Sequence, residues 1–140
     1  MKNAIEHLGE WPIPGVEARK NGRLIHIPRA KVLRLIHGKK NHFGISFFVS
    51  NDYVHFGTMQ IPKGVYSDPE IHKGDEVLFI LKGTLTVQAI EDDDGDESVL
   101  HETYEINEGE QFLMPEGVKH RYLNFSNNVV EALFAIAPGL

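Results

Sequence analysis

The chain has 140 residues, which fits a single domain, because two independent cores of this total size would each be marginal. It contains no cysteine, which excludes disulfides, thiolate zinc sites and a cysteine nucleophile; eight histidines and twenty acidic residues remain as nitrogen and oxygen ligands. The formal net charge of −6 argues against a nucleic acid or an anionic membrane as partner, since either would require a basic face. With no apolar leader and no stretch of roughly twenty apolar residues, we expect a soluble cytoplasmic protein.

Residues 1–22 come first and differ in pattern from the rest of the chain. Residues 3–9 are compatible with one short helical turn, whereas residues 11–15 must run extended, because each of their two prolines biases the preceding residue away from the helical region. We expect an N-terminal arm over residues 1–22 that lies on the domain or on a neighbouring subunit, with Trp11 as a packing anchor. A single domain over residues 23–140 follows.

From Arg23 onward, short apolar or alternating runs are separated by turn residues, which is typical of strands. The runs predict strands at residues 23–27, 32–36, 44–49, 53–61, 76–81, 84–90, 98–106, 111–114, 119–124 and 129–137. Lys82 and Gly83 predict a tight hairpin. The acidic run at 91–97 is interpreted as a solvated hairpin tip, because a calcium loop of the EF-hand kind needs a longer pattern flanked by helices. Regular spacing without helical stretches predicts an all-β fold, a sandwich or barrel of antiparallel strands.

Three potential metal ligands, Glu70, His72 and Glu76, lie close together in one segment. Side chains alternate along an extended chain, so Glu70 and His72 are expected to point the same way. Residues 73–75 form a short loop in which Gly74 is available for a positive φ, so the chain can reverse directly after His72. Glu76 then opens the return strand almost opposite His72, and the three side chains converge within one predicted hairpin.

A fourth potential ligand, His120, follows a turn that contains Pro115 and Gly117. The strand after this turn carries His120, Tyr122 and Asn124 on one face. Two neutral imidazoles with one or two carboxylates suit a divalent first-row metal.

These two segments resemble the two sequence motifs of the cupin family. Residues at the family's spacings in the first motif are Gly64, Glu70, His72, Glu76 and Gly83, and in the second motif Gly109, Pro115, Gly117, His120 and Asn124. The motifs together span residues 64–124. The resemblance implies a cupin jelly-roll β-barrel, an antiparallel double sheet with a metal inside the barrel that is open at one mouth.

The resemblance also implies roles for individual residues. His72, Glu76 and His120 would be metal ligands, with one divalent ion of Fe, Mn, Zn, Ni or Co as the cofactor, and Asn124 would make a structural hydrogen bond. Some cupins have lost the metal and bind or isomerise sugars through side chains alone. Because those cupins usually lose several ligand positions and this chain keeps three, a metal site is the preferred hypothesis.

Glu70 departs from the family pattern, since most metal-binding cupins have a histidine at this position. Three roles are open, in order of preference. Glu70 ligates the metal and completes a shell of two histidines and two carboxylates; or it transfers protons beside a triad of the other ligands; or it pairs with Lys73 or Arg121 at the rim and does no chemistry.

Tyr122 shares the strand face of His120, so its hydroxyl is a candidate to orient or protonate a substrate, with simple packing as the equal alternative. His55 lies on a strand that leads into the first motif, where a structural hydrogen bond is the more common role. An apolar wall is expected from Leu78, Ile80, Phe112 and Met114. No role is assigned to His7, His26, His37 and His42, and His101 is interpreted as a surface residue.

Three functions are compatible with these residues, because a fold does not fix a function. The first is a metal-dependent enzyme on a small polar metabolite such as a sugar, keto acid or hydroxy acid, with Glu70 or Tyr122 moving a proton in an isomerisation, epimerisation, elimination or decarboxylation. The second is a non-haem iron dioxygenase, which the apolar wall favours. The third is a non-catalytic cupin that binds a small ligand. Cupins of this size are commonly dimers, so a homodimer is expected.

Overall fold

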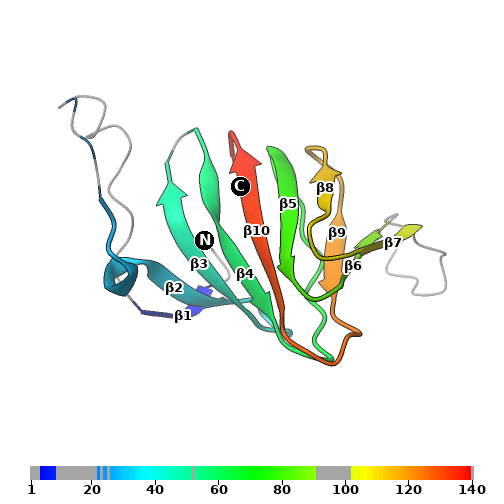
Figure 1. The fold of residues 1–140 in the computed structure, drawn as a ribbon. Helices are drawn as coiled ribbons and strands as arrows, with labels where there is room; N and C mark the ends of the chain where they lie inside the picture. Colours follow the sequence, from blue (N-terminus) through cyan, green and yellow to red (C-terminus); the bar gives the residue numbers. More distant parts are fainter. Residues whose placement is uncertain are drawn as a thin grey trace.

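The computed structural model describes residues 4–8, 22, 24, 26–51, 53–90 and 102–139, and its regular structure is almost entirely antiparallel β-sheet (Figure 1). The elements are β1 (Ala4–Leu8), η1 (Arg29–Lys31), β2 (Leu33–His37), β3 (Phe43–Ser50), β4 (His55–Ile61), β5 (Asp75–Lys82), β6 (Leu85–Ala89), β7 (Glu102–Ile106), β8 (Gln111–Met114), β9 (His120–Leu123) and β10 (Val130–Ala137). No helix in this part of the chain is long and apolar enough to cross a membrane. The predicted all-β fold is confirmed.

The strands form two sheets that face each other as in a jelly roll. The large sheet has the order β1-β2-β3-β4-β10-β5-β8, and the small sheet has the order β7-β6-β9. In Figure 1 the strands of the small sheet are seen beside β8, at the right of the view. Residues 64–72 extend the small sheet on the free side of β9, through isolated bridges between Tyr66 and Leu123 and between Glu70 and His120.

The core lies between the sheets, and its residues are set by strand alternation. In β10 the inward residues Val130, Ala132, Phe134 and Ile136 are all buried, while the residues between them are less so. Phe47 of β3 meets Phe134 edge-on, with ring centroids 5.6 Å apart. Burial of such side chains contributes about 25 cal/mol per Å² of apolar surface.

Two local predictions were wrong. Residues 4–8 form strand β1 instead of a helical turn, because they pair with the free edge of β2. The predicted strand at 23–27 is absent at Leu24, His26 and Ile27, since β2 is already paired on both edges. Trp11, the acidic run at 91–97 and His101 lie outside the described residues.

The predicted hairpin at Lys82 and Gly83 joins two strands of different sheets. Gly83 has the expected positive φ of 84°, but β5 pairs with β10 and β8, whereas β6 pairs with β7 and β9. The turn chemistry was therefore predicted correctly and the pairing was not, because the same glycine conformation serves a hairpin and a passage between sheets.

Gly74 also serves a different purpose from the one predicted. Its φ is not positive. A Cβ at this position would lie 2.5 Å from the carbonyl oxygen of Ala137 and 2.8 Å from that of Gly139. Gly74 is therefore required by the close approach of the C-terminal backbone to the loop between His72 and Glu76.

Candidate metal centre

The backbone of Glu70 is paired directly with that of His120. The amide of Glu70 donates to the carbonyl of His120 at 2.8 Å, and the amide of His120 donates to the carbonyl of Glu70 at 2.9 Å. The amide of Gly117 donates to the carbonyl of His72 at 2.9 Å. The two motif segments, about fifty residues apart in the chain, are thus joined by main-chain hydrogen bonds, which fix the relative positions of their side chains.

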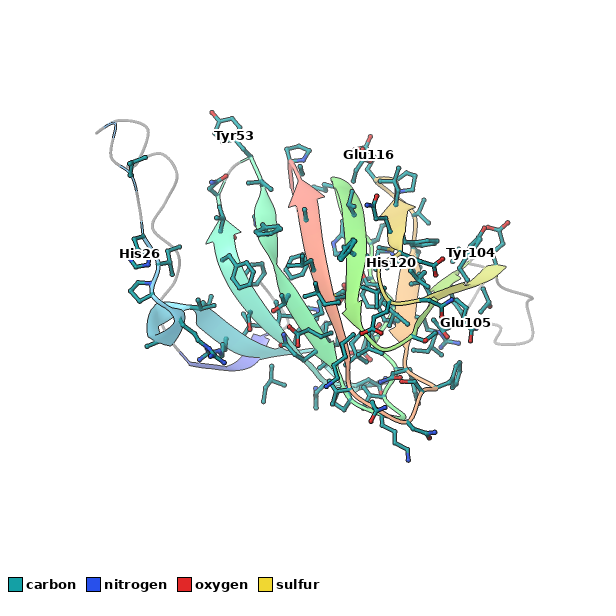
Figure 2. All side chains as sticks on the ribbon, viewed as in Figure 1. His26, Tyr53, Tyr104, Glu105, Glu116 and His120 are labelled. Carbon is teal, nitrogen blue, oxygen red and sulfur yellow. The ribbon has the colours of Figure 1, made fainter. Side chains whose placement is uncertain are left out.

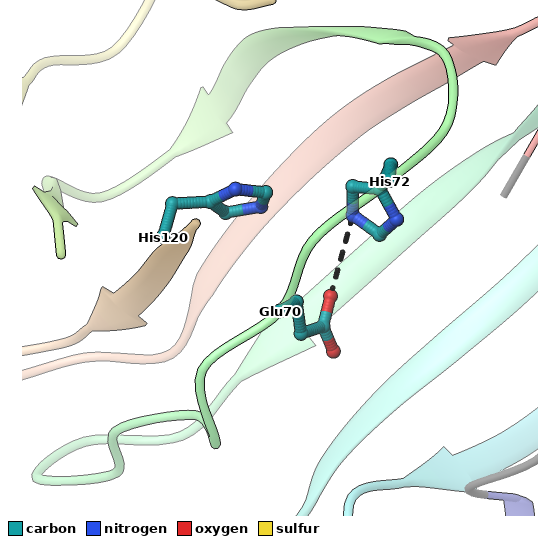
Figure 3. Close-up of side chains that lie close together, drawn as sticks. All are labelled: Glu70, His72 and His120. Atoms are coloured by element: carbon teal, nitrogen blue, oxygen red, sulfur yellow. Dashed lines mark ion pairs between the residues drawn. The ribbon is translucent and has the colours of Figure 1, made fainter. Parts of the chain in front are cut away.

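Glu70, His72 and His120 point toward one another at this junction (Figure 3). One ligand atom from each lies within 4.8 Å of those of the other two, and Oε2 of Glu70 is 3.5 Å from Nε2 of His72. Between Glu70 and His72, Ile71 is 61% exposed, so the predicted alternation holds although these residues form no regular strand. One carboxylate and two imidazoles suit a divalent first-row metal.

Glu76 is buried in β5 and approaches both histidines. Its Oε2 is 3.0 Å from Nε2 of His72 and 3.9 Å from Nε2 of His120. Its Oε1 accepts a hydrogen bond from the hydroxyl of Tyr122, which is also 3.1 Å from Nε2 of His120. The structure therefore brings together all five residues that the sequence singled out.

The ring of His120 is held by its other nitrogen. Nδ1 lies 2.9 Å from the carbonyl oxygen of Val118, which is an acceptor, so Nδ1 carries a proton and Nε2 is the nitrogen that would face a metal. This hydrogen bond sets the tautomer that a metal requires at Nε2.

The contact between His37 and Glu70 was not predicted from the sequence. Nε2 of His37 is hydrogen-bonded to Oε1 of Glu70, and this histidine is only 5% exposed. Glu70 thus contacts His37 and His72, in place of the Lys73 or Arg121 considered from the sequence; Arg121 instead donates to Gln88 at 2.7 Å. A signal was present, because Leu33, Leu35 and His37 share the inward face of β2.

Burial and ion pairing shift the pKa values of Glu70 and His72 in opposite directions. Burial by itself raises the pKa of Glu70, but the hydrogen bond with His37 and the electrostatic interactions with His37 and His72 outweigh it and bring this pKa to about 2. Burial lowers the pKa of His72, but the carboxylates of Glu70 and Glu76 raise it to about 9. Burial, with the nearby carboxylate charges, raises the pKa of Tyr122 well above its ordinary value. In the metal-free protein the cluster therefore holds an ionised Glu70 beside a protonated His72, with a neutral Tyr122.

Two buried polar atoms at the centre of the cluster make no hydrogen bond. They are Nε2 of His72 and Oε2 of Glu76, which approach each other to 3.0 Å without the direction of a hydrogen bond. They are paired by charge, without the directed hydrogen bonds that buried polar atoms usually make. Because both atoms belong to residue types that ligate metals, the donor set fits a divalent ion bound between them.

A cavity of about 320 Å³ adjoins the cluster on the side of His120. It lies between β8 of the large sheet and the strands of the small sheet, and Tyr104 and Phe112 contact each other in its wall, with centroids 5.2 Å apart. Its lining consists of Val87, Ala89, Glu102, Tyr104, Phe112, Leu113, Met114, Pro115, Val118 and His120. Figure 2 shows Tyr104 and His120 on this side of the molecule. Phe112 and Met114 therefore line a pocket, whereas Leu78 and Ile80 are fully buried core residues.

Two other expectations concern single residues. Asn124 makes the predicted structural hydrogen bonds, since its Nδ2 donates to the carbonyl oxygens of Ile61 and Asn128, both at 2.8 Å. His55 contacts Ser50 through Nδ1 at 2.7 Å, as a structural histidine would.

Two facing antiparallel sheets with histidines and carboxylates clustered between them define a jelly-roll protein with a candidate metal centre. Residues 57–136, more than half of the chain, match the sequence model of the cupin domain, and the chain belongs to the cupin family.

Solved structures share this fold. A Bacillus halodurans protein is 26% identical, with a TM-score of 0.57 over 66% of this chain and 67% of its own. A cupin domain from Bordetella pertussis is 20% identical, with a TM-score of 0.55 over 71% of this chain and 96% of its own. Oxalate oxidase is 21% identical, with a TM-score of 0.52 over 61% of this chain and 42% of its own; these last two likenesses concern the fold alone. No curated protein matches the chain.

Proposed function

We propose that the protein is a metal-dependent cupin enzyme acting on a small polar metabolite, with a divalent ion held by His72, Glu76 and His120 and completed by Glu70. The observation that carries this proposal is the convergence of buried ligand atoms on His72, Glu76 and His120, of which Nε2 of His72 and Oε2 of Glu76 make no hydrogen bond. A cluster kept only for stability would be expected to satisfy these atoms with hydrogen bonds.

The donor set favours a metal that holds oxygen ligands of the substrate. Two carboxylates cancel the charge of a divalent ion, so the bound metal is less electrophilic than one held by three histidines and one carboxylate. When bound, such an ion polarises a carbonyl or holds vicinal oxygens. Fe, Mn, Zn, Ni and Co all accept nitrogen and oxygen ligands of this kind.

Tyr122 is the proposed proton donor for the reaction. Its hydroxyl is buried and keeps its proton at neutral pH, because burial and the carboxylates of Glu76 and Glu70 raise its pKa. It lies 3.1 Å from Nε2 of His120, so a substrate atom beside the metal would be within its reach. Isomerisation, epimerisation, elimination and decarboxylation are the reaction classes that need such a group.

A small acid is the substrate class that a structural neighbour supports. Recombinant oxalate oxidase, 21% identical over 61% of this chain, has been solved in complex with glycolate, a hydroxy acid. The cupin fold therefore accommodates such a molecule in that protein, which supports keto and hydroxy acids as the first compounds to test here.

The apolar cavity beside His120 favours one second candidate, a non-haem iron dioxygenase. An aromatic or aliphatic substrate would bury its apolar part against Tyr104 and Phe112, with a polar group directed to the metal. The ligands His72, Glu76 and His120 would then form the two-histidine, one-carboxylate arrangement of such enzymes.

We also propose a homodimer that uses the outer face of the large sheet. Phe56, Val77 and Leu113 are 36%, 44% and 58% exposed, and they lie in one cross-strand row through Ala135. Light scattering at micromolar concentration tests this, and a monomer that persists at high concentration would contradict it.

Metal content is the first experiment. The full chain is expressed with metal supplementation and analysed by elemental mass spectrometry; we expect close to one equivalent, and less than about one tenth would overturn the metal proposal. His42→Gln, at an exposed position, is the control for His72→Gln and His120→Gln, which should lose the metal.

Reaction type is tested on the protein reconstituted with each candidate metal. Product formation from keto and hydroxy acids without oxygen supports the first proposal, whereas oxygen consumption by the iron form supports the dioxygenase. Binding of a ligand without turnover in either assay would identify a non-catalytic cupin. Glu70→Gln separates the roles of that residue: loss of metal indicates ligation, and retained metal with lost turnover indicates proton transfer.

A further inference from the structure

The two carboxylate oxygens of Glu70 face two histidines from different parts of the fold. Its Oε1 is hydrogen-bonded to Nε2 of His37, and its Oε2 faces Nε2 of His72 at 3.5 Å. His37 is the last residue of β2, on the large sheet, whereas Glu70 is bridged to the small sheet. One oxygen of Glu70 is therefore occupied outside the ligand cluster and the other is left inside it.

The ring of His37 is buried and packed, although its Nδ1 makes no hydrogen bond. The residue is 5% exposed and its ring meets that of Phe43 edge-on, with centroids 5.2 Å apart. Its backbone is paired with Phe43 in β3. His37 is not a member of the cluster of Glu70, His72 and His120 whose ligand atoms lie within 4.8 Å of one another, so its contact with the centre is through Glu70.

A second connection fixes the distance between His37 and Glu70. The turn that follows β2 is bound by the carboxylate of Asp68, which accepts hydrogen bonds from the backbone amides of Lys39, Lys40 and Asn41 at 2.7, 3.0 and 3.3 Å. Asp68 is two residues before Glu70. The turn beside His37 and the segment that carries Glu70 are thus joined independently of the His37–Glu70 hydrogen bond.

We propose that His37 is a positioning residue, which holds Oε1 of Glu70 so that Oε2 is presented to the metal as a ligand. The inference rests on the proposed metal site and adds to it a residue outside both cupin motifs. A glutamate side chain has three rotatable bonds, and ordering it on metal binding costs conformational entropy. A hydrogen bond to the far oxygen supplies this order before the metal arrives, and loss of such a supporting contact typically lowers metal affinity 10–100-fold.

The test replaces His37 by two amide residues whose side-chain nitrogens lie at different distances from the backbone. His37→Gln places its amide nitrogen near the position of Nε2 and can still donate to Glu70, whereas His37→Asn places its amide near the position of Nδ1 and cannot. Metal-free full-length protein is titrated with Co²⁺, and both the dissociation constant and the visible absorption of the bound ion are recorded. We expect His37→Asn to weaken Co²⁺ binding at least tenfold and change the spectrum, and His37→Gln to stay within about threefold of the parent.

A double-mutant cycle shows whether His37 acts through Glu70. In a Glu70→Gln background, His37→Asn should have no further effect on Co²⁺ affinity, because the carboxylate that it positions is gone. His42→Asn, at an exposed position in the loop between β2 and β3, is the control and should bind Co²⁺ as the parent does.

The outcomes separate the inference from the proposed function. If the parent protein does not bind Co²⁺, the metal site fails and the inference with it. If the parent binds and His37→Asn binds equally well, or if the Asn and Gln variants are equally impaired, or if the effects of His37 and Glu70 simply add, the positioning role alone is overturned. His37→Phe, of similar volume and without a donor, is carried through the same titrations in case the Asn variant does not fold, which a thermal melt in EDTA shows.

Discussion

The hydroxyl of Tyr122 donates a hydrogen bond to Oε1 of Glu76, between two side chains that are 1% and 2% exposed. The bond joins the small sheet to the large one inside the barrel. It leaves Oε2 of Glu76 as the oxygen directed toward the histidines. The tyrosine therefore decides which oxygen of this carboxylate is available to a metal.

Tyr122→Phe should destabilise the metal-free protein by about 1–3 kcal/mol, because it leaves a buried carboxylate oxygen without its donor. Urea denaturation in EDTA measures the change. Tyr104→Phe is the matched control: its hydroxyl donates to Glu102 at an exposed site, and its removal should leave the unfolding curve unchanged. Equal curves for Tyr122→Phe and the parent would show that the bond contributes nothing to stability.

The stability of the metal-free protein should be greatest between about pH 4.5 and 6.5. The pKa of Glu70 is lowered from 4.5 to about 2, so its contribution is present above pH 4.5 and is lost as the pH falls toward 2. The pKa of His72 is raised from 6.5 to about 9, so its contribution is complete below pH 6.5 and is lost as the pH rises through 9. Free energies of unfolding measured from pH 3 to 10 in EDTA test this.

His72→Gln identifies the source of the alkaline decline. Without a titrating imidazole at position 72, the loss of stability between pH 6.5 and 9 should become smaller, while the acidic limb due to Glu70 should persist in a weakened form. A decline of the same size in this variant would assign it to another group.

Metal binding near pH 7 should release about one proton. In the metal-free protein His72 remains protonated up to a pKa of about 9, and a metal ligand must be deprotonated. The apparent affinity for Zn²⁺ should therefore rise about tenfold for each pH unit between 7 and 9. Calorimetry in two buffers of different ionisation enthalpy counts the protons, and equal heats in both buffers would contradict the prediction.

Gly74→Ala should both destabilise the fold and weaken metal binding. A Cβ here meets the carbonyl oxygen of Ala137 at 2.5 Å, so the loop between His72 and Glu76 must move, at a cost of about 2 kcal/mol or more. Gly109→Ala is the control, because its φ is +81° but its surroundings are open; we expect a cost of about 1 kcal/mol from conformation alone and unchanged affinity for metal. Unaltered metal affinity in Gly74→Ala would show that the loop tolerates the shift.

Local alternation was the part of the site that could be predicted from the sequence. Glu70 and His72 face the same way because the chain between them is extended, and this holds without a regular strand. His120 and Tyr122 share a face of β9 for the same reason, and both are buried. Such relationships depend only on residues that are neighbours in the chain, so they can be predicted from one sequence.

Contacts across the barrel could not be predicted in the same way. Alternation in β2 indicates that His37 points inward, but only the pairing of whole strands places it against Glu70, thirty-three residues later. The passage from β5 to β6 at Gly83 has the same limitation, because a glycine with positive φ indicates a turn and does not name the strand that is paired next. The helical turn expected at residues 3–9 was wrong because an unpaired edge of β2 overrides a weak local preference.

The reciprocal backbone hydrogen bonds between Glu70 and His120 fix the main chain at position 70, whichever side chain that position carries. The main chain sets where this side chain begins, and the residue type sets only which donor atom it offers. Glu70→His would thus return the family's common three-histidine, one-glutamate set on an unchanged backbone. Single substitutions at this position, in evolution or in the laboratory, can thus alter the preference for one metal over another while the fold of the barrel stays the same.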